Sequence, residues 1–425
     1  MCRCAPLTTA ALLLFAGSLC RAQTATSPAH EPASEKTIEA GGADAEAPKR
    51  KLVRWNEYEG PYFTIRMGGG LLLEYDAYAQ DEESKQQFAL NPEAKVRDFR
   101  FLLRGRFPRF KRSVTWCAGI MYNGASSSWL MRETGVMFEL PEWWGYLFVG
   151  RTKEGFSLNK VMSGYSGWTL ERSTMSDATV PILGDGVKWL GYVPGRHLLW
   201  NVGYYLDYIN EDQSFSSYDN QVVARVAWLP LNSENSGTLV HLGINTRYGN
   251  VDQGELQIRS RPEAFTAPYF LDTGEFPADK TKMAGIELYY RPGPWLFGTE
   301  YWFQDVSSNA TGNPLFQGGD VVATWLITGE TRSYNTTGGY FKSVSPSRPV
   351  FEGGPGAWEA VLRFSYTNLD SGSLEGGKFW RVTPMVNWYL SDNLRLELAY
   401  GYGRLDRFDL QGDTQFFQVR LQMVL

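Results

Sequence analysis

The alternation of apolar and polar residues with a period of two constrains the fold of this chain more than any other feature. It is clearest at the C-terminal end, where apolar positions recur at every second residue from 417 to 425. These positions are Phe417, Val419, Leu421, Met423 and Leu425, with Gln418, Arg420 and Gln422 among the residues between them. The pattern predicts a strand with one apolar face, and about nine residues is the length of a tilted strand that crosses a bilayer. One such strand also fits a soluble sandwich, in which the apolar face would be internal.

The same alternation recurs along most of the chain. We expect about sixteen strands, at 62–79, 96–107, 112–123, 132–139, 145–151, 186–193, 197–208, 220–231, 237–249, 280–291, 295–304, 318–327, 356–368, 378–390, 394–407 and 414–425. An even number is typical of bacterial outer-membrane barrels. A closed barrel is required because, within a bilayer, every backbone N–H and C=O group must find a partner in the protein.

The connections between these segments alternate between short and long. Short ones lie at 108–111, 141–144, 194–196, 232–236, 292–294 and 391–393. Short periplasmic turns and long extracellular loops are the outer-membrane pattern, although the connection at 328–355 is long where a short turn is expected. Tryptophans cluster near the short turns, as in an interfacial aromatic belt: Trp116, Trp143, Trp144, Trp200, Trp228, Trp295, Trp358 and Trp388.

Composition excludes several other classes. Beyond the first 25 residues the chain has no apolar run of about 20 residues, which excludes a helical membrane protein. Its 15% aromatic content excludes disorder of the whole chain, and a net charge of -5 gives no polybasic signal for nucleic acid. The fold class is therefore all-β, a transmembrane antiparallel β-barrel.

The first residues have the features of a secretory signal peptide. Arg3 precedes an apolar stretch, and Cys20-Arg21-Ala22 fits a cleavage site, so we expect a signal peptide at 1–22 and a flexible linker at 23–58. The barrel would then occupy 59–425. Three of the four cysteines leave with the signal, and Cys117 alone remains, so no internal disulfide forms.

Basic residues fall on the polar face of many strands, which would point into the lumen. They are Arg66, Arg100, Arg104, Arg106, Arg225, Arg247, Arg363, Arg381, Arg395 and Arg420. Rings of Arg and Lys form anion filters, and Arg matches the geometry of phosphate oxygens. The alternative is that inward arginines pair with inward acids and brace the wall, for which Glu74, Asp76, Glu287, Glu300, Glu359 and Glu397 are available.

Several segments resemble the phosphate-selective porin O/P family. The stretch Phe148–Ser157 (FVGRTKEGFS) is similar to the family's "vGxxKxxFS" segment, and Glu171-Arg172-Ser173 to its "mERs". Residues 326–334 (LITGETRSY) and 356–359 (GAWE) resemble two further family segments in the same order. The resemblance implies a sixteen-stranded outer-membrane barrel, usually trimeric, with loops folded inward. Leu425 departs from the family, whose barrels commonly end in an aromatic residue.

The long loop at 152–185 is the expected constriction. It carries Lys153, which matches the family's motif lysine, as well as Lys160 and Arg172. For either Lys153 or Arg172 an anchoring role is an equal alternative to pore lining, since the Glu171-Arg172 pair can anchor the loop by a salt bridge.

The predicted function is passive diffusion of small anions across the bacterial outer membrane, with phosphate or polyphosphate as candidate solutes. The alternative is a less selective porin for small hydrophilic solutes. An outer-membrane enzyme is disfavoured because only His197 and His241 remain in the folded region, and no metal-site spacing is present. A gated transporter would need a plug domain, which the linker is too short to form. We expect outer-membrane lipid, the barrel assembly machinery and two further copies of the chain as partners, and no cofactor or nucleic acid.

Overall fold

The computed structural model describes residues 55–206, 218–233 and 236–425. The expected signal peptide at 1–22 lies outside the described residues, as does all but the end of the expected linker at 23–58. That end forms β1 (Glu57–Glu59), which pairs antiparallel with β2 (Thr64–Gln80).

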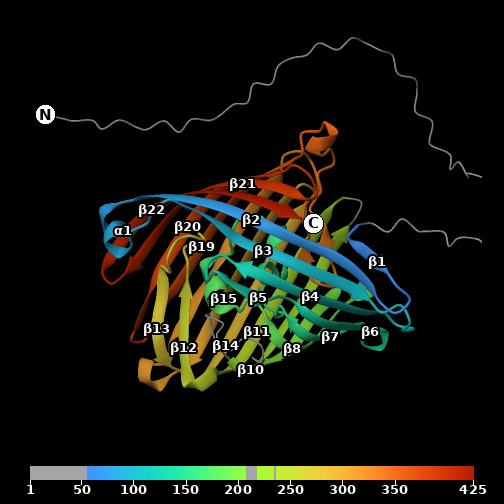
Figure 1. Cartoon of the computed structure of the whole chain (residues 1–425). Coiled ribbons are helices and arrows are strands. Elements are labelled where there is room, and N and C mark those ends of the chain that lie inside the picture. Colours follow the sequence, from blue (N-terminus) through green and yellow to red (C-terminus); the bar gives the residue numbers. More distant parts are fainter. Residues whose placement is uncertain (1–54, 207–217, 234–235) are drawn as a thin grey trace, which may run out of the picture. The chain divides into compact units, whose positions relative to one another are not determined.

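Antiparallel strands form one closed barrel (Figure 1). After β2 they are β3 (Glu93–Arg106), β4 (Val114–Asn123), β5 (Ser128–Met131), β6 (Thr134–Leu140), β7 (Gly145–Thr152), β8 (Gly184–Val193), β9 (Leu198–Leu206), β10 (Tyr218–Ser233), β11 (Thr238–Val251), β14 (Lys280–Pro292), β15 (Trp295–Ser307), β16 (Leu315–Leu326), β19 (Ala357–Ser371), β20 (Leu374–Tyr389), β21 (Leu394–Arg407) and β22 (Leu410–Val424). The barrel closes because β2 pairs with β3 on one side and with β22 on the other. Since β5 and β6 both pair with β4 and act as one interrupted strand, the described residues form sixteen barrel strands, as predicted.

Two of the expected long loops are tight turns instead. The strands β19 and β20 continue to Ser371 and Leu374, and β21 and β22 are joined by Phe408 and Asp409. Phe408 and Asp409 both have positive φ, 53° and 61°, which is the backbone of a two-residue hairpin turn that follows the twist of the strands. The Gly-, Ser- and Asp-rich sequence around these turns hides the strand extension.

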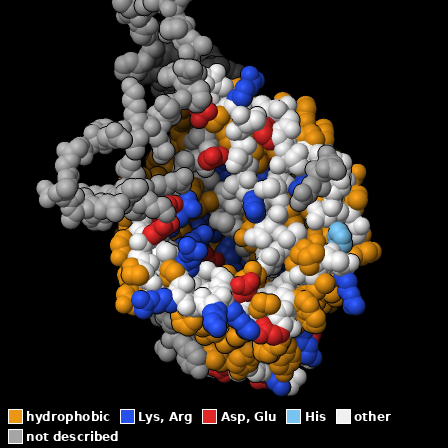
Figure 2. Space-filling view, turned by 90° about the vertical axis from the view of Figure 1, so that its right-hand side faces the viewer, with side chains coloured by type: hydrophobic (Ala, Val, Ile, Leu, Met, Phe, Trp, Pro, Cys, Tyr) orange, Lys and Arg blue, Asp and Glu red, His pale blue; other side chains and the backbone are white. Residues whose placement is uncertain are grey.

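The outer surface of the barrel is apolar. Ile244, Val321 and Leu362 are more than half exposed and lie on the outward face of their strands. Trp295 stacks on Trp325 with ring centroids 5.0 Å apart. Figure 2 shows hydrophobic side chains around the outer rim of the barrel and charged side chains within it. None of the helices in the described part of the chain has the length and apolar character needed to cross a bilayer.

Three connections fold into the lumen. The constriction loop (153–183) contains α2 (Leu158–Val161), the 3-10 turn η2 (Gly164–Ser166) and α3 (Thr174–Thr179). The lumen hairpin (252–279) contains β12 (Glu255–Ser260) and β13 (Leu271–Pro277). The return segment (327–356) contains β17 (Tyr334–Asn335) and β18 (Tyr340–Phe341), and it enters from the short-turn end. A further connection, between β2 and β3, holds α1 (Glu82–Gln87), whose first turn is capped by the Asp81 side chain accepting from the Ser84 backbone N–H at 2.7 Å.

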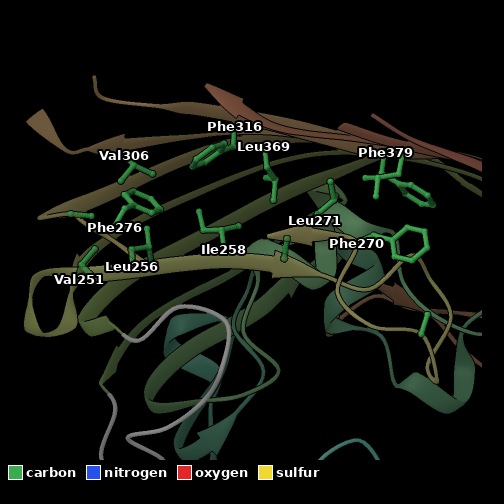
Figure 3. Close-up of a cluster of buried hydrophobic side chains, with 14 of the residues drawn as sticks. Val251, Leu256, Ile258, Phe270, Leu271, Phe276, Val306, Phe316, Leu369 and Phe379 are labelled. Carbon is green, nitrogen blue, oxygen red and sulfur yellow. The ribbon is translucent and has the colours of Figure 1, made fainter. Parts of the chain in front are cut away.

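The lumen hairpin packs on an apolar surface inside the barrel (Figure 3). Leu256, Ile258 and Phe276 from the hairpin are in one buried cluster with Phe316 and Leu369 from β16 and β19. Residues on the inward face of a water-filled barrel are usually polar. The apolar cluster therefore turns this part of the lumen into a protein core.

The constriction loop and the return segment contact one another in a second buried cluster. Trp168 of the constriction loop lies 6.2 Å from Phe341 of the return segment and 5.9 Å from Tyr289 of β14, measured between ring centroids. Leu158 and Met162 belong to the same cluster. The open part of the lumen is thereby displaced toward the opposite wall, formed by β2 to β9.

Candidate pore and its charged lining

A bulge in β3 changes which side chains face the lumen. Leu72 of β2 is opposite Asp98, whereas its neighbour Leu73 is opposite Val96, so Arg97 is an extra residue in β3. Bulges re-aim side chains and are frequent next to functional sites. Arg97 and Asp98 consequently both face inward, although they are adjacent in the chain.

The break between β5 and β6 has the same effect on the neighbouring wall. Ile120 of β4 is opposite Met131 and Cys117 is opposite Gly135, which leaves one residue more on the β5–β6 side. Arg132 and Glu133 lie in this break, and both line the same cavity. Strict alternation would have turned one of them to the lipid.

These side chains border a cavity of about 640 Å³, which we call the basic cavity. Its cationic lining residues come from β2, β3, the β5–β6 break, the constriction loop and the return segment: Arg66, Arg100, Arg104, Arg132, Lys153 and Lys342. Among the described lining residues, Glu133 has the one acidic side chain, and Leu425, the last residue of the chain, also lines the cavity. Seen from the short-turn end, Lys and Arg side chains gather inside the hollow of the barrel (Figure 2).

The cations of this cavity differ in how far they are neutralised. Arg100 donates to Asp98 at 2.6 Å and lies 4.3 Å from the ring centroid of Tyr165. Arg66 lies 3.6 Å from a Glu57 oxygen, in a largely exposed pair. Within the described residues, Arg104, Arg132 and Lys342 have no carboxylate within ion-pair distance.

Six of the arginines expected to face an open pore hold the inserted segments against the wall instead. Arg225 pairs with Glu287 at 2.7 Å and donates to the Gly339 carbonyl at 2.6 Å. The others contact the constriction loop, the lumen hairpin or wall acids: Arg247 donates to the Thr179 carbonyl, Arg363 to Glu263, Arg381 to the Pro262 carbonyl, Arg395 to the Gly167 carbonyl and Arg420 to Glu74 and Glu171. All six are buried, and buried charges persist only when they are paired and hydrogen-bonded.

Arg106 is placed differently again. It lies on the inward side of β3 close to the turn, its side chain is exposed, and it is not among the residues that line the basic cavity. The structure therefore brings Arg66, Arg100 and Arg104 together and separates them from the other expected arginines.

The three basic residues of the constriction loop have distinct environments. The Lys153 ammonium donates to the carbonyls of Lys160 and Met162, at 3.1 and 2.5 Å, and borders the basic cavity. Lys160 donates to the Ser176 carbonyl at 3.2 Å, and burial lowers its pKa to about 7. Arg172 donates to the carbonyls of Asn159 and Met162, at 3.1 and 2.9 Å, so it ties the loop to itself.

The neighbouring Glu171 anchors the loop to the wall. It accepts from Arg97 at 2.8 and 2.9 Å and also from Arg420. Burial alone would raise its pKa, but Arg97 and Arg420 hold the pKa of Glu171 well below its usual range. The anchoring ion pairs that we considered for Arg172 are therefore made by the adjacent glutamate.

Strand alternation alone missed several lining residues. The two bulges turn Arg97, Arg132 and Glu133 inward. In the sequence, the sign of each bulge is a pair of adjacent charged residues that interrupts the alternation of apolar and polar positions. Lys342 belongs to the return segment, which has no strand pattern from which a direction could be read.

The two histidines are wall and turn residues. The His241 ring bonds to a Glu287 oxygen at 2.8 Å and to the Tyr334 hydroxyl at 2.7 Å, which links β11 to β14 and to the return segment. His197 lies at the short turn between β8 and β9.

Comparison with known proteins agrees with this geometry. The family model "Phosphate-selective porin O and P" matches residues 66–425. Porin O of Pseudomonas aeruginosa is 24% identical over 224 residues, which are 44% of this chain and 50% of that protein. An uncharacterized protein of Caulobacter vibrioides is 29% identical over 181 residues, 42% of this chain and 35% of that protein. The chain thus spans half or less of the length of these relatives.

Solved structures share the fold at low sequence identity. The anion-selective porin from Comamonas acidovorans is 11% identical, with a TM-score of 0.52, over 85% of this chain and 100% of that one. The outer membrane channel DcaP of Acinetobacter baumannii is 10% identical, with a TM-score of 0.53, over 86% and 98%. OmpT of Vibrio cholerae in a trimer form is 12% identical, with a TM-score of 0.51, over 86% and 100%. The chain therefore belongs to the phosphate-selective porin O and P family, and it shares the β-barrel fold of these outer-membrane proteins.

Proposed function

We propose that this porin is a passive, non-enzymatic channel that prefers small anions, and that the basic cavity is its selectivity region. The observation that carries the proposal is the unequal charge of that cavity. Six residues with cationic side chains border it, against one acidic side chain among the described lining residues. Arg104, Arg132 and Lys342 have no ion-pair partner in the described part of the chain, so their field acts on the solute.

The position of the cavity supports the same proposal. The lumen hairpin fills one part of the barrel with an apolar core, and the constriction loop and return segment fill another. A solute that crosses the barrel is thereby directed along β2 to β9, past Arg104 and Arg132 on the wall and Lys342 on the return segment. Rings of Arg and Lys at a narrow point favour anions because they replace part of the hydration of the ion.

Reversal potentials in a KCl gradient across a planar bilayer test the proposal. We expect a chloride preference that falls as salt rises, since screening shortens the range of the lining charges. A cation preference would refute it. Addition of phosphate distinguishes a phosphate site from a general anion pathway. Strong reduction of the chloride current by phosphate would indicate a phosphate site, and no reduction would indicate a general anion pathway.

We also propose that the mature chain begins after residue 22 and assembles as a homotrimer. The signal pattern at 1–22 supports the first point, and the trimer form of the Vibrio cholerae OmpT supports the second. N-terminal sequencing of the purified protein and the mass of the detergent-solubilised complex test these two points separately.

A further inference from the structure

A second cavity adjoins the basic cavity and has a different character. Its volume is about 480 Å³, and its wall side is lined by Met137, Tyr146 and Leu190 from β6, β7 and β8. The inserted segments contribute Val161 and Tyr340. Polar side chains line it as well, among them Ser113, Asn201, Asn335 and Thr337, so we call it simply the second cavity. It shares Glu133, Lys153, Val161 and Tyr340 with the basic cavity, so the two are contiguous.

The apolar wall residues are cross-strand neighbours on the lumen face. Met137 is opposite Phe148, which is opposite Lys188, and Tyr146 is opposite Leu190. The lumen of a porin is normally polar. Elsewhere in this barrel, inward apolar residues such as Phe316 and Leu369 are fully covered by the lumen hairpin. The stripe on β6 to β8 differs because it borders a cavity.

Cationic donors accompany the apolar surface. The Lys188 ammonium donates to the Thr152 hydroxyl at 2.7 Å and to the Lys153 carbonyl at 3.2 Å. An ammonium has three N–H donors, so one is not used by these two bonds, and the ammonium lies 5.4 Å from the centroid of the Phe148 ring. A smaller cavity of about 180 Å³ is lined by both Lys188 and Arg104, together with Met137, Phe148 and Leu190. Cations and apolar surface are therefore presented in the same space.

We propose that the preferred solutes are amphipathic organic anions, small carboxylates that carry an apolar body, rather than inorganic anions. This inference rests on the anion preference proposed above. A carboxylate accepts from Arg104 and Lys188, while its apolar body displaces water from Met137 and Leu190. Inorganic phosphate gains nothing from the apolar surface, and Glu133 repels a multiply charged anion more strongly than a singly charged one.

Benzoate and acetate are suitable probes because they carry the same charge and differ in their apolar part. We would measure the reduction of single-channel chloride current by each anion at about pH 6.5, where both are ionised. If the apolar wall covers about 50 Å² of the benzoate ring, benzoate binds about tenfold more tightly than acetate. We therefore expect the concentration that halves the chloride current to be about tenfold lower for benzoate. Equal block by the two anions, with chloride preference retained, would overturn this inference alone. Cation preference would overturn the proposed function itself.

The variant Met137→Ser/Leu190→Ser tests whether the apolar wall is the cause. We expect it to bring benzoate block to the level of acetate block, with chloride conductance and anion preference unchanged. The matched control is Phe351→Ser, which removes an aromatic side chain that is 72% exposed and lines neither cavity. If the double variant does not fold, Leu190→Thr alone gives a smaller shift in the same direction. Full benzoate preference in a folded variant would overturn the inference.

Discussion

Replacement of Arg104 by Ala should weaken anion selectivity measurably. Arg104 lies on the inward face of β3, borders the basic cavity and has no carboxylate within ion-pair distance in the described residues. A volume of about 640 Å³ corresponds to a sphere of about 5 Å radius, at which one charge acts on a monovalent ion in water with about 0.8 kcal/mol. Screening at 0.1 M salt reduces this to about 0.5 kcal/mol.

The charge acts with opposite sign on the two ions of the salt. Its removal therefore changes the free-energy difference between chloride and potassium by about 1 kcal/mol, which is about a fivefold loss of the permeability ratio. The assay is the reversal potential in a KCl gradient. Arg106→Ala is the control, since Arg106 is two residues away on the same face of β3 and does not line the cavity. Equal effects of the two substitutions would refute the reasoning, because they would show a general charge effect.

Three further predictions concern the inserted segments. Glu263→Gln leaves the buried Arg363 without its carboxylate, so we expect about 3–5 kcal/mol of lost stability and loss of the folded form at lower temperature in a gel mobility assay. Leu256→Ala opens a void under the lumen hairpin, which should cost about 2–5 kcal/mol and speed proteolysis within residues 252–279. Because burial lowers the pKa of Lys160 to about 7, the unfolded state binds more protons above that pH. Stability should thus rise between about pH 7 and pH 10, by at most about 1.4 kcal/mol per pH unit, and Lys160→Met should flatten the rise in thermal unfolding.

Matched substitutions separate these effects from general damage. Glu375→Gln removes an exposed carboxylate and should leave stability unchanged. Leu315→Ala truncates a side chain that is 46% exposed and should cost less than Leu256→Ala. Equal loss in either comparison would contradict the role of burial. A pH dependence that persists in Lys160→Met would assign it to another group.

The strands were predictable because their apolar face is continuous and its period is two. The segment 394–407 is a strand with the same bounds as predicted, and the other strands differ by a few residues at their ends. A long connection also lies between β7 and β8, at the position of the predicted loop 152–185, and its role as the constriction stays a prediction. The strand pairing was predictable as well, because in a barrel of this kind each strand pairs with its neighbours in the sequence and the first strand pairs with the last.

The candidate site was less predictable, for two physical reasons. Alternation gives a direction only where no residue is inserted, and the bulges at Arg97 and at Arg132–Glu133 break it. Alternation also does not reveal what fills the lumen. Arg225 and Arg420 face inward as predicted, but the inserted segments reach them and use their charge.

The wall partners of the constriction loop affect the order in which the channel is completed. Glu171 is held by Arg420 of β22, and the Gly167 carbonyl by Arg395 of β21, so the anchoring of the constriction loop is completed by the last two strands of the chain. The residues in these contacts are more than 200 positions apart in the sequence. We expect such contacts to form late in folding, because bringing distant residues together costs chain entropy before the contacts between them stabilise the fold. A barrel that has not yet received β22 therefore lacks the contacts of Arg420 with this loop. Joining of the C-terminal strand to β2 both closes the sheet and completes the anchoring of the constriction loop, so we expect an assembly defect at this seam to loosen the loop as well as the barrel.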